Sequence, residues 1–238
     1  MSADGTNNIY LSPHHDDAAF SLGAWILAQP GGALVNLFTR SEFTEGRVLE
    51  GIEAVSAVRA AEDDVFARRC GLEVVRLGLE EPSLRGRKPR DAAGVTDDIA
   101  QLRGPLVDWL DAHADGASAI FCPAAIGGHV NHLATRIVAW EWAVARGRET
   151  SLRFYEDLPY ARRPHLRRRG LVDLRAATAG WVLRREAWRA GATKLELIGL
   201  YPTQLDRTPT MRRYSPFAFW PLGWHEAVWV PVRQITAS

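Results

Sequence analysis

The sequence predicts an α/β fold, a Rossmann-like three-layer sandwich with a mostly parallel sheet and a C-terminal cap rich in aromatic residues. Short apolar runs alternate with segments of helical periodicity over residues 8–155. The runs are apolar throughout, which is typical of parallel strands that helices cover on both faces. After residue 160 this alternation stops. We therefore expect one domain over residues 1–238, with a core over about 1–160 and a cap over about 161–238.

The first part of the alternation predicts three strands and two helices. Pro30-Gly31-Gly32 ends the first helix and Gly71 closes the second, because both are helix-stop signals. We expect strands over Asn8–Ser12, Ala33–Thr39 and Glu73–Leu77, and helices over Asp17–Gln29 and Ile52–Cys70.

The second part continues after a loop over Gly78–Arg90. We expect helices over Val95–His113 and His132–Arg146, and strands over Ala119–Cys122 and Arg153–Tyr155. In the cap we expect a basic loop over Arg162–Arg169, a strand over Leu174–Leu183 and a helix from Arg185 to about Gly199. The aromatic tail either forms a lid over a cleft or packs on the sheet, and packing is favoured because tryptophan buries a large area. Its aromatic residues are Phe217, Phe219, Trp220, Trp224 and Trp229.

Composition limits the classes of partner. The 238 residues carry a net charge of +1, which favours neither a nucleic-acid partner nor an acidic one. The basic run Arg162–Arg169 has no interleaved aromatic residues, so a solvated surface is favoured over a nucleic-acid site. No apolar run suits a signal peptide or a membrane span. We expect a cytoplasmic protein with buried free thiols at Cys70 and Cys122. We also expect a small-molecule substrate, and the sequence leaves homo-oligomerisation open.

Two polar motifs follow two of the predicted strands. Ser12-Pro13-His14-His15-Asp16-Asp17 comes directly after the first strand, and Gly127-Gly128-His129-Val130-Asn131-His132 follows the strand at Ala119–Cys122. In open parallel sheets, binding sites lie in the crevice beyond the carboxyl ends of the strands. We therefore expect the two motifs to form one site.

The residue types of the two motifs indicate a catalytic metal site. His14, Asp17 and His132 form a set of two histidines and one carboxylate, which leaves one position of a zinc ion open for water. Asp16 is placed to take a proton from that water as general base. His129 is placed to protonate the leaving group or to hold a developing oxyanion.

Three other interpretations stay open. Asp16 or Asp17 could simply cap the following helix. His14-His15-Asp16 with His132 also matches the pattern of a non-haem Fe(II) oxygenase, although such sites usually occupy all-β folds. The third alternative is a non-catalytic metal-binding or assembly protein.

The chain resembles the PIG-L/LmbE-like family of zinc-dependent N-acetylglucosaminyl deacetylases. Pro13-His14-His15-Asp16-Asp17 is similar to the first family motif, and His129-Val130-Asn131-His132 to the second. The resemblance implies de-N-acetylation of an amino sugar or glycosylated small molecule, and natural-product biosynthesis is one setting that it suggests. It also implies Zn²⁺, or Fe²⁺ in its place. The implied roles are metal ligands for His14, Asp17 and His132, general base for Asp16, support of the tetrahedral intermediate for His129, and substrate binding for Arg40 and Glu81. Weaker similarities lie at Lys194, Tyr201–Gln204 and His225-Glu226.

The chain departs from the family pattern at two positions. Ala18 stands where the family usually has glutamate, and Asn131 where it often has aspartate. If Asn131 faces His129, we expect the pKa of that imidazole to be lower than beside an aspartate. In addition, Gly127-Gly128 supplies no tyrosine as an oxyanion donor.

Overall fold

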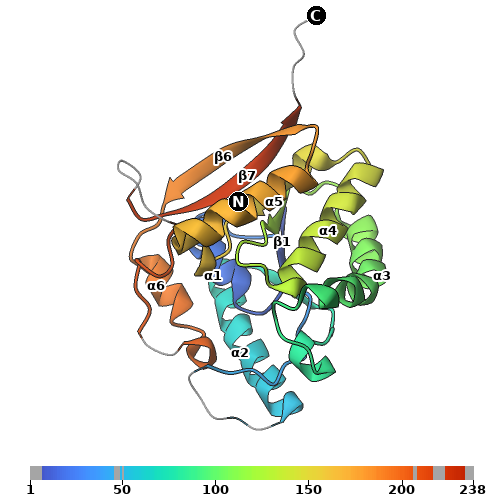
Figure 1. Ribbon diagram of the computed structural model, residues 1–238. Helices are drawn as coiled ribbons and strands as arrows, with labels where there is room; N and C mark the ends of the chain where they lie inside the picture. The colour runs from blue at the N-terminus through green and yellow to red at the C-terminus, as the bar shows by residue number, and fades with distance from the viewer. Residues whose placement is uncertain (1–6, 46–48, 50, 206–207, 217–222, 234–238) are drawn as a thin grey trace, which may run out of the picture.

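A seven-stranded sheet in the order β3-β2-β1-β4-β5-β7-β6 forms the centre of the protein. It is seen in a computed structural model that describes residues 7–45, 49, 51–205, 208–216 and 223–233 (Figure 1). Strands β1 to β5 are parallel, and β7 is antiparallel to both of its neighbours. The strands are β1 (Asn8–Ser12), β2 (Ala33–Asn36), β3 (Glu73–Arg76), β4 (Ala119–Pro123), β5 (Leu152–Tyr155), β6 (Trp181–Arg189) and β7 (His225–Arg233).

Helices cover both faces of the sheet, so the predicted three-layer sandwich is confirmed. α3 and α4 pack on each other on one side, whereas α1 packs on α2 and α6 on the other side (Figure 1). Gly71 ends α2 in the left-handed conformation, with φ of 66°. The helices are α1 (Asp17–Ala28), α2 (Ile52–Cys70), α3 (Val95–His113), α4 (Val130–Ala145), α5 (Pro164–Ala177) and α6 (Thr193–Ile198).

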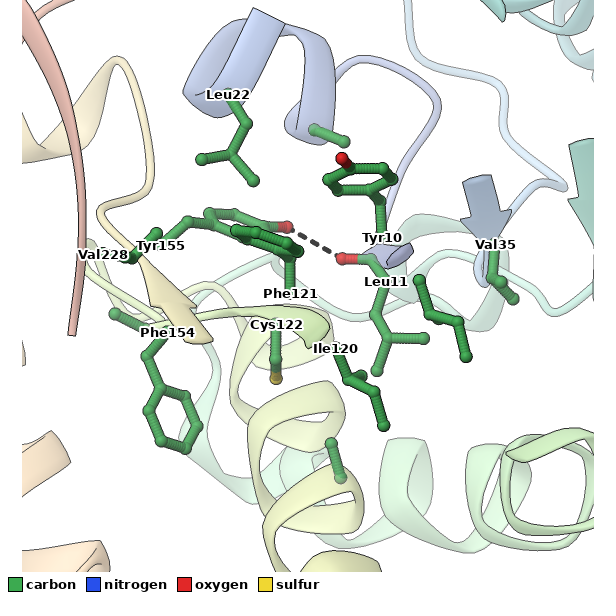
Figure 2. Close-up of a cluster of buried hydrophobic side chains, with 14 of the residues drawn as sticks. Tyr10, Leu11, Leu22, Val35, Ile120, Phe121, Cys122, Phe154, Tyr155 and Val228 are labelled. Atoms are coloured by element: carbon green, nitrogen blue, oxygen red, sulfur yellow. Dashed lines mark hydrogen bonds between the residues drawn. The ribbon is translucent and has the colours of Figure 1, made fainter. Parts of the chain in front are cut away.

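The core holds the carboxyl ends of the central strands in place. Every residue of β1 and β4 is buried. Tyr10 stacks on Phe121 of the neighbouring strand, with ring centroids 4.9 Å apart. The Tyr155 hydroxyl donates to the Leu11 carbonyl oxygen at 3.0 Å and so ties β5 to β1 across β4 (Figure 2). The loops that leave these three strands therefore start from a fixed base.

The C-terminal third differs from the predicted elements. The basic run Arg162–Arg169 is mostly helical, because Pro164 begins α5 and its fixed φ suits a first helical position. The predicted strand at Leu174–Leu183 is wrong over most of its length, since α5 continues to Ala177 and β6 begins only at Trp181. The predicted helix from Arg185 to about Gly199 is wrong at its start, because the chain stays in β6 to Arg189, paired with the unpredicted strand β7. Its last part is helical, in α6. Pairing with a strand so distant in sequence overrides the local pattern.

The aromatic tail contributes to this added pair of strands. Trp229 lies buried in β7, which confirms packing for that residue. Trp224 just before β7 is 46% exposed. Phe217, Phe219 and Trp220 lie outside the described residues.

Cys70 and Cys122 are buried free thiols, as predicted. In the part of the chain that the structure describes, no helix is long and apolar enough to span a membrane.

Glu156, directly after β5, joins three C-terminal elements to the sheet. Its buried carboxylate accepts from Arg167 of α5 at 2.6 and 2.7 Å and from Arg185 of β6 at 2.9 Å. Trp229 of β7 donates to it at 3.1 Å. Burial alone would raise the pKa of Glu156, but the two guanidinium groups outweigh burial and lower it. Glu156 thus fixes the start of the segment that continues with Asp157.

We expect Glu156→Gln to lower the free energy of unfolding by about 2 kcal/mol at pH 7, because charge-assisted hydrogen bonds become neutral ones. A folded-state pKa below the ordinary value means that the carboxylate stabilises the fold above about pH 4.5 and ceases to do so as the pH falls. Urea unfolding of both proteins at pH 7 and pH 3.5 checks this. A difference in free energy of unfolding between the two proteins that is as large or larger at pH 3.5 than at pH 7 would contradict it.

Candidate metal centre

The two polar motifs meet between β1 and β4, where the order of the strands in the sheet reverses. β1 and β4 are neighbours, and the helices that follow them, α1 and α4, lie on opposite faces of the sheet. Ser12 shapes the first loop: its hydroxyl donates to the His14 carbonyl oxygen at 2.6 Å and accepts from the Ala18 N–H at 3.0 Å. The side chains of both motifs are thereby brought to one place.

His14, Asp17 and His132 converge as predicted. All are buried, and one donor atom from each lies within 4.8 Å of the other two. Asp17 Oδ2 is 2.9 Å from His14 Nδ1 and 3.2 Å from His132 Nε2. Asp16 makes no side-chain capping bond to α1, and Asp17 accepts the His14 N–H at 2.8 Å instead. Simple helix capping therefore does not account for the motif.

The chemistry of this donor set fits a divalent metal ion such as zinc. Asp157 Oδ1 lies 2.7 Å from His132 Nδ1 and accepts that N–H, so Nε2 is the nitrogen that would bind a metal ion once its own proton is lost. Burial alone would lower the pKa of His132, but Asp17 and Asp157 outweigh it and raise the pKa to about 10. The pocket thus favours positive charge, which a metal ion supplies. Two imidazoles and one carboxylate suit Zn²⁺ and Fe²⁺.

The Asn131 side chain contacts the imidazole of His14 and not that of His129, so the condition considered for the pKa of His129 is not met. Asn131 Oδ1 lies 2.9 Å from His14 Nε2 and accepts that N–H, which leaves His14 Nδ1 with a lone pair beside Asp17. Its amide nitrogen donates to Asp98 Oδ2 at 2.8 Å, and Asp98 pairs with Arg85. An aspartate at this position would face the Asp98 carboxylate, which accounts for asparagine here.

We expect Asn131→Ala to weaken zinc affinity by about 10–100-fold, because His14 loses the partner that fixes its orientation. Competition with a chelator of known affinity measures this, with circular dichroism to confirm folding. The matched control is Asn7→Ala, which removes an amide distant from the site that bonds only the Gly116 carbonyl oxygen. Equal zinc affinity in Asn131→Ala and wild type would contradict the role given to Asn131.

Asp16 lies in the cavity beside this donor set but is not part of it. Its Oδ1 is 3.6 Å from Arg59 Nη2. Burial and the nearby Asp17 carboxylate raise the pKa of Asp16 to about 6, although Arg59 lowers it in part. Arg59 also donates to Glu81 at 2.6 Å and to Ser41 at 2.7 Å. The Asp16 carboxylate is therefore held in position by a buried guanidinium.

His129 also lies beside the donor set, without being part of it. Its ring lies edge-on to His14, with centroids 4.7 Å apart, and 5.2 Å from the ring of His132. Burial, followed by the charges of His14 and His132, lowers its pKa well below the usual value. The Asn131 N–H donates to His129 Nδ1 at 3.3 Å, so the neutral ring carries its proton on Nε2. His129 can thus donate a hydrogen bond.

A cavity of about 590 Å³ opens over these residues. Glu81 lines it, in line with the substrate-binding role predicted for it. Arg40 is not among its lining residues: its half-exposed side chain pairs with Glu53 and Glu80, and the geometry gives its predicted role no support. The further lining residues include Phe20, Phe43, Glu45, Arg90, Tyr160, Gln204, Arg213 and Tyr214.

Three residues at the site were not predicted. Asp157 follows the apolar strand β5, so the strand-end argument used for the two motifs applies to it as well. Arg59 carried no signal, since it lies within the helical pattern of α2. Tyr160 lines the cavity, and burial raises its pKa to about 12, so its hydroxyl stays protonated. It packs where a Cβ of Gly127 would lie, 2.6 Å from its Cγ, which explains glycine there.

The geometry disfavours the His-x-Asp oxygenase pattern. That pattern needs Asp16 as ligand, whereas Asp17 is the carboxylate that meets His14 and His132. The fold is α/β and not all-β.

A curated relative and several solved structures that are similar to this chain are named as deacetylases. The chain is 37% identical to the 2'-N-acetylparomamine deacetylase of Streptomyces fradiae over 161 residues, which are 64% of this chain and 57% of that protein. The alignment thus spans little more than half of that relative's length. No family model matches the chain.

Solved structures share the fold over nearly the whole chain. The A40926 pseudoaglycone deacetylase Dbv21 superposes with a TM-score of 0.67 at 21% identity, covering 98% of this chain and 100% of the other. A deacetylase–teicoplanin complex gives a TM-score of 0.69 at 17% identity, with 97% and 100% coverage. The zinc-inhibited form of teicoplanin deacetylase Orf2 gives 0.67 at 19% identity, with 98% and 100% coverage. These likenesses show the α/β fold of the chain.

Proposed function

We propose that this protein is a metal-dependent hydrolase that removes an acyl group from the nitrogen of an amino sugar in a glycosylated small molecule. The observation that carries the proposal is the convergence of His14, Asp17 and His132 beside a cavity that His14, Asp17 and Asp16 line. The similarity to a deacetylase that acts on an acylated aminoglycoside supports the reaction type. The two sequence motifs that supply these residues follow the ends of the neighbouring strands β1 and β4.

His14, Asp17 and His132 would hold a zinc ion, or iron in its place. A bound zinc ion would polarise the amide carbonyl and bring the pKa of a water molecule near 7. Asp16 accepts a proton from the attacking water. The Nε2–H of His129 donates to the oxygen that becomes negative as the water adds to the carbonyl carbon.

The reaction then balances without a further reagent. As the carbon–nitrogen bond breaks, the leaving nitrogen takes up the proton that Asp16 removed from water. The products are a carboxylic acid and the free amine. Arg59 keeps Asp16 oriented throughout, since it is buried and bonded to Glu81 and Ser41.

The cavity fits a sugar with hydroxyl groups. Glu81 and Gln204 supply acceptors and donors on its wall, and Phe20, Phe43 and Tyr214 supply apolar surface. Ligand sites commonly combine such apolar walls with a few placed polar groups. The acetyl group is the acyl group we propose.

Metal content and hydrolysis together test the proposal. We expect about one divalent metal ion per wild-type chain purified without chelator or histidine tag, and its loss in His132→Ala, because one of three ligands is removed. His113→Ala is the matched control, since His113 is an exposed histidine of α3. Mass spectrometry should count zinc, iron and other divalent metals.

Hydrolysis is measured on 2'-N-acetylparomamine and on simple N-acetylglucosaminyl glycosides, by detection of released acetate and free amine. Loss of activity in His132→Ala and its retention in His113→Ala would support the proposal. Metal content that is equal in wild type and His132→Ala would contradict the ligand set. A metal-loaded protein that cleaves none of these amides would contradict the reaction.

A further inference from the structure

A second cavity of about 460 Å³ adjoins the proposed active site. The two cavities share Arg162 and Arg163, which stand in the wall of both. A ligand that fills the first cavity can therefore extend over these two residues into the second.

The second cavity is strongly basic. Among the described residues that line it, Arg162, Arg163, Arg212 and His165 are basic, and none is an aspartate or glutamate. Several arginines elsewhere in the protein pair with carboxylates, such as Arg167 with Glu156 and Arg59 with Glu81. The side chains of Arg162, Arg163 and Arg212 make no ion pair or hydrogen bond within the described part of the chain. Three guanidinium groups without partners at one cavity favour an anionic ligand group.

An aromatic surface lies in the same cavity. Trp224 is 46% exposed and lines it together with Pro164 and Pro216. An exposed tryptophan in a cavity wall offers a flat apolar face for an aromatic or sugar ring. The wall of the first cavity, in contrast, has the carboxylates Asp16, Asp17, Glu45 and Glu81 beside its arginines. The described wall of the second cavity has arginines and no carboxylate to balance them.

We propose that the second cavity is a subsite for an anionic group, a carboxylate or a phosphate, on the part of the substrate that lies beyond the acylated sugar. This inference rests on the proposed deacylation and names its substrate class: acylated amino-sugar glycosides whose aglycone carries a ring and a negative charge. Arg212 is a specificity-determining residue because it lines the second cavity and not the first. Trp224 contacts the ring that carries the charge.

Three matched probes test the subsite. They are N-acetylglucosaminides with a 4-carboxyphenyl, a 4-phosphonooxyphenyl or a neutral 4-(methoxycarbonyl)phenyl aglycone. Calorimetry gives the Kd of each probe, and acetate release gives kcat/KM. We expect wild type to bind at least one anionic probe about tenfold more tightly than the neutral one, because a hydrogen bond to a charged group exceeds a neutral one by about this factor. The preference should fall as salt is added.

Arg212→Gln should remove most of this preference and leave binding of the neutral probe unchanged. Arg168→Gln is the matched control, because it makes the same change at an exposed arginine of the basic run Arg162–Arg169 that lines neither cavity. Trp224→Ala should weaken all three probes by about 3–10-fold.

Equal binding of charged and neutral probes, an unchanged preference in Arg212→Gln, or no binding of any probe would each overturn the subsite. Hydrolysis separates this result from the proposed function. If every probe binds and none is cleaved, the deacylation of such glycosides is contradicted while the calorimetry still decides the subsite. If all are cleaved with equal kcat/KM and equal Kd, deacylation stands and the subsite is overturned.

Discussion

Replacing Asp16 with asparagine is expected to lower the rate of deacylation by about 10²–10⁴-fold and to leave the bound metal in place. Asparagine keeps the shape of the side chain but does not accept a proton from water. Asp16 lies outside the set of His14, Asp17 and His132, so the ligands remain complete. Its nearest charged partner is Arg59, at 3.6 Å.

Two readouts make this prediction sharp. Single-turnover acetate release gives the rate, and mass spectrometry gives the metal content of the same sample. Asp115→Asn is a suitable control, since its carboxylate lies at the surface and pairs with Arg148. A rate equal to that of wild type would show that Asp16 is not the general base. Loss of metal would show that Asp16, and not only Asp17, is a ligand.

Replacing Glu226 with alanine is expected to reduce the free energy of unfolding by about 3–5 kcal/mol, the cost of breaking a buried ion pair from one side. The Glu226 carboxylate is fully buried, 2.8 Å from the equally buried Lys194 ammonium. It also accepts the N–H groups of Ala24 at 3.0 Å and Trp25 at 2.9 Å, and the Trp188 indole N–H at 2.9 Å. Alanine leaves an uncompensated charge and several unpaired donors in the core.

Glu196→Ala provides the matched comparison. It removes the same kind of side chain from the same region, but the pair that it breaks, with Arg69, is exposed. Exposed ion pairs contribute about 0–1 kcal/mol. Chemical denaturation of both variants and wild type at pH 7 measures the difference. Equal losses in Glu226→Ala and Glu196→Ala would contradict the structural role of the buried pair.

The parallel part of the fold could be predicted because its signal is local. Strands β1, β2 and β4 are short, mostly apolar runs, and β3 and β5 each contain adjacent apolar residues. A helix-stop signal ends α1 and α2 close to where they were expected. The end of the chain could not be predicted in this way. β6 is partly exposed and carries charged residues such as Arg184 and Glu186, so it lacks the apolar pattern of a central strand. Only its pairing with β7 makes it a strand.

The convergence of His14, Asp17 and His132 could be predicted because their residue types are rare and follow strand ends. The residues that surround and orient these three side chains could not be predicted. Which way Asn131 points depends on Asp98, which the sequence places far away and in a helix. Arg59 reaches the site from the middle of α2, so nothing in its neighbours distinguishes it from a surface arginine. For this reason Arg40, and not Arg59, is the arginine that was expected at the site from the sequence.

The wall of the first cavity has a consequence for how this scaffold can be changed. The metal donors, Asp16 and Asp157 all come from the first 157 residues, whereas Tyr160, Gln204, Arg213 and Tyr214 come from the chain that follows. The proposed reacting groups therefore lie in the first two thirds of the chain, and much of the surface that would meet a ligand lies in the last third. We expect a chimera that joins this N-terminal part to the C-terminal part of a deacetylase with a similar fold to change selectivity and to keep the proposed chemistry.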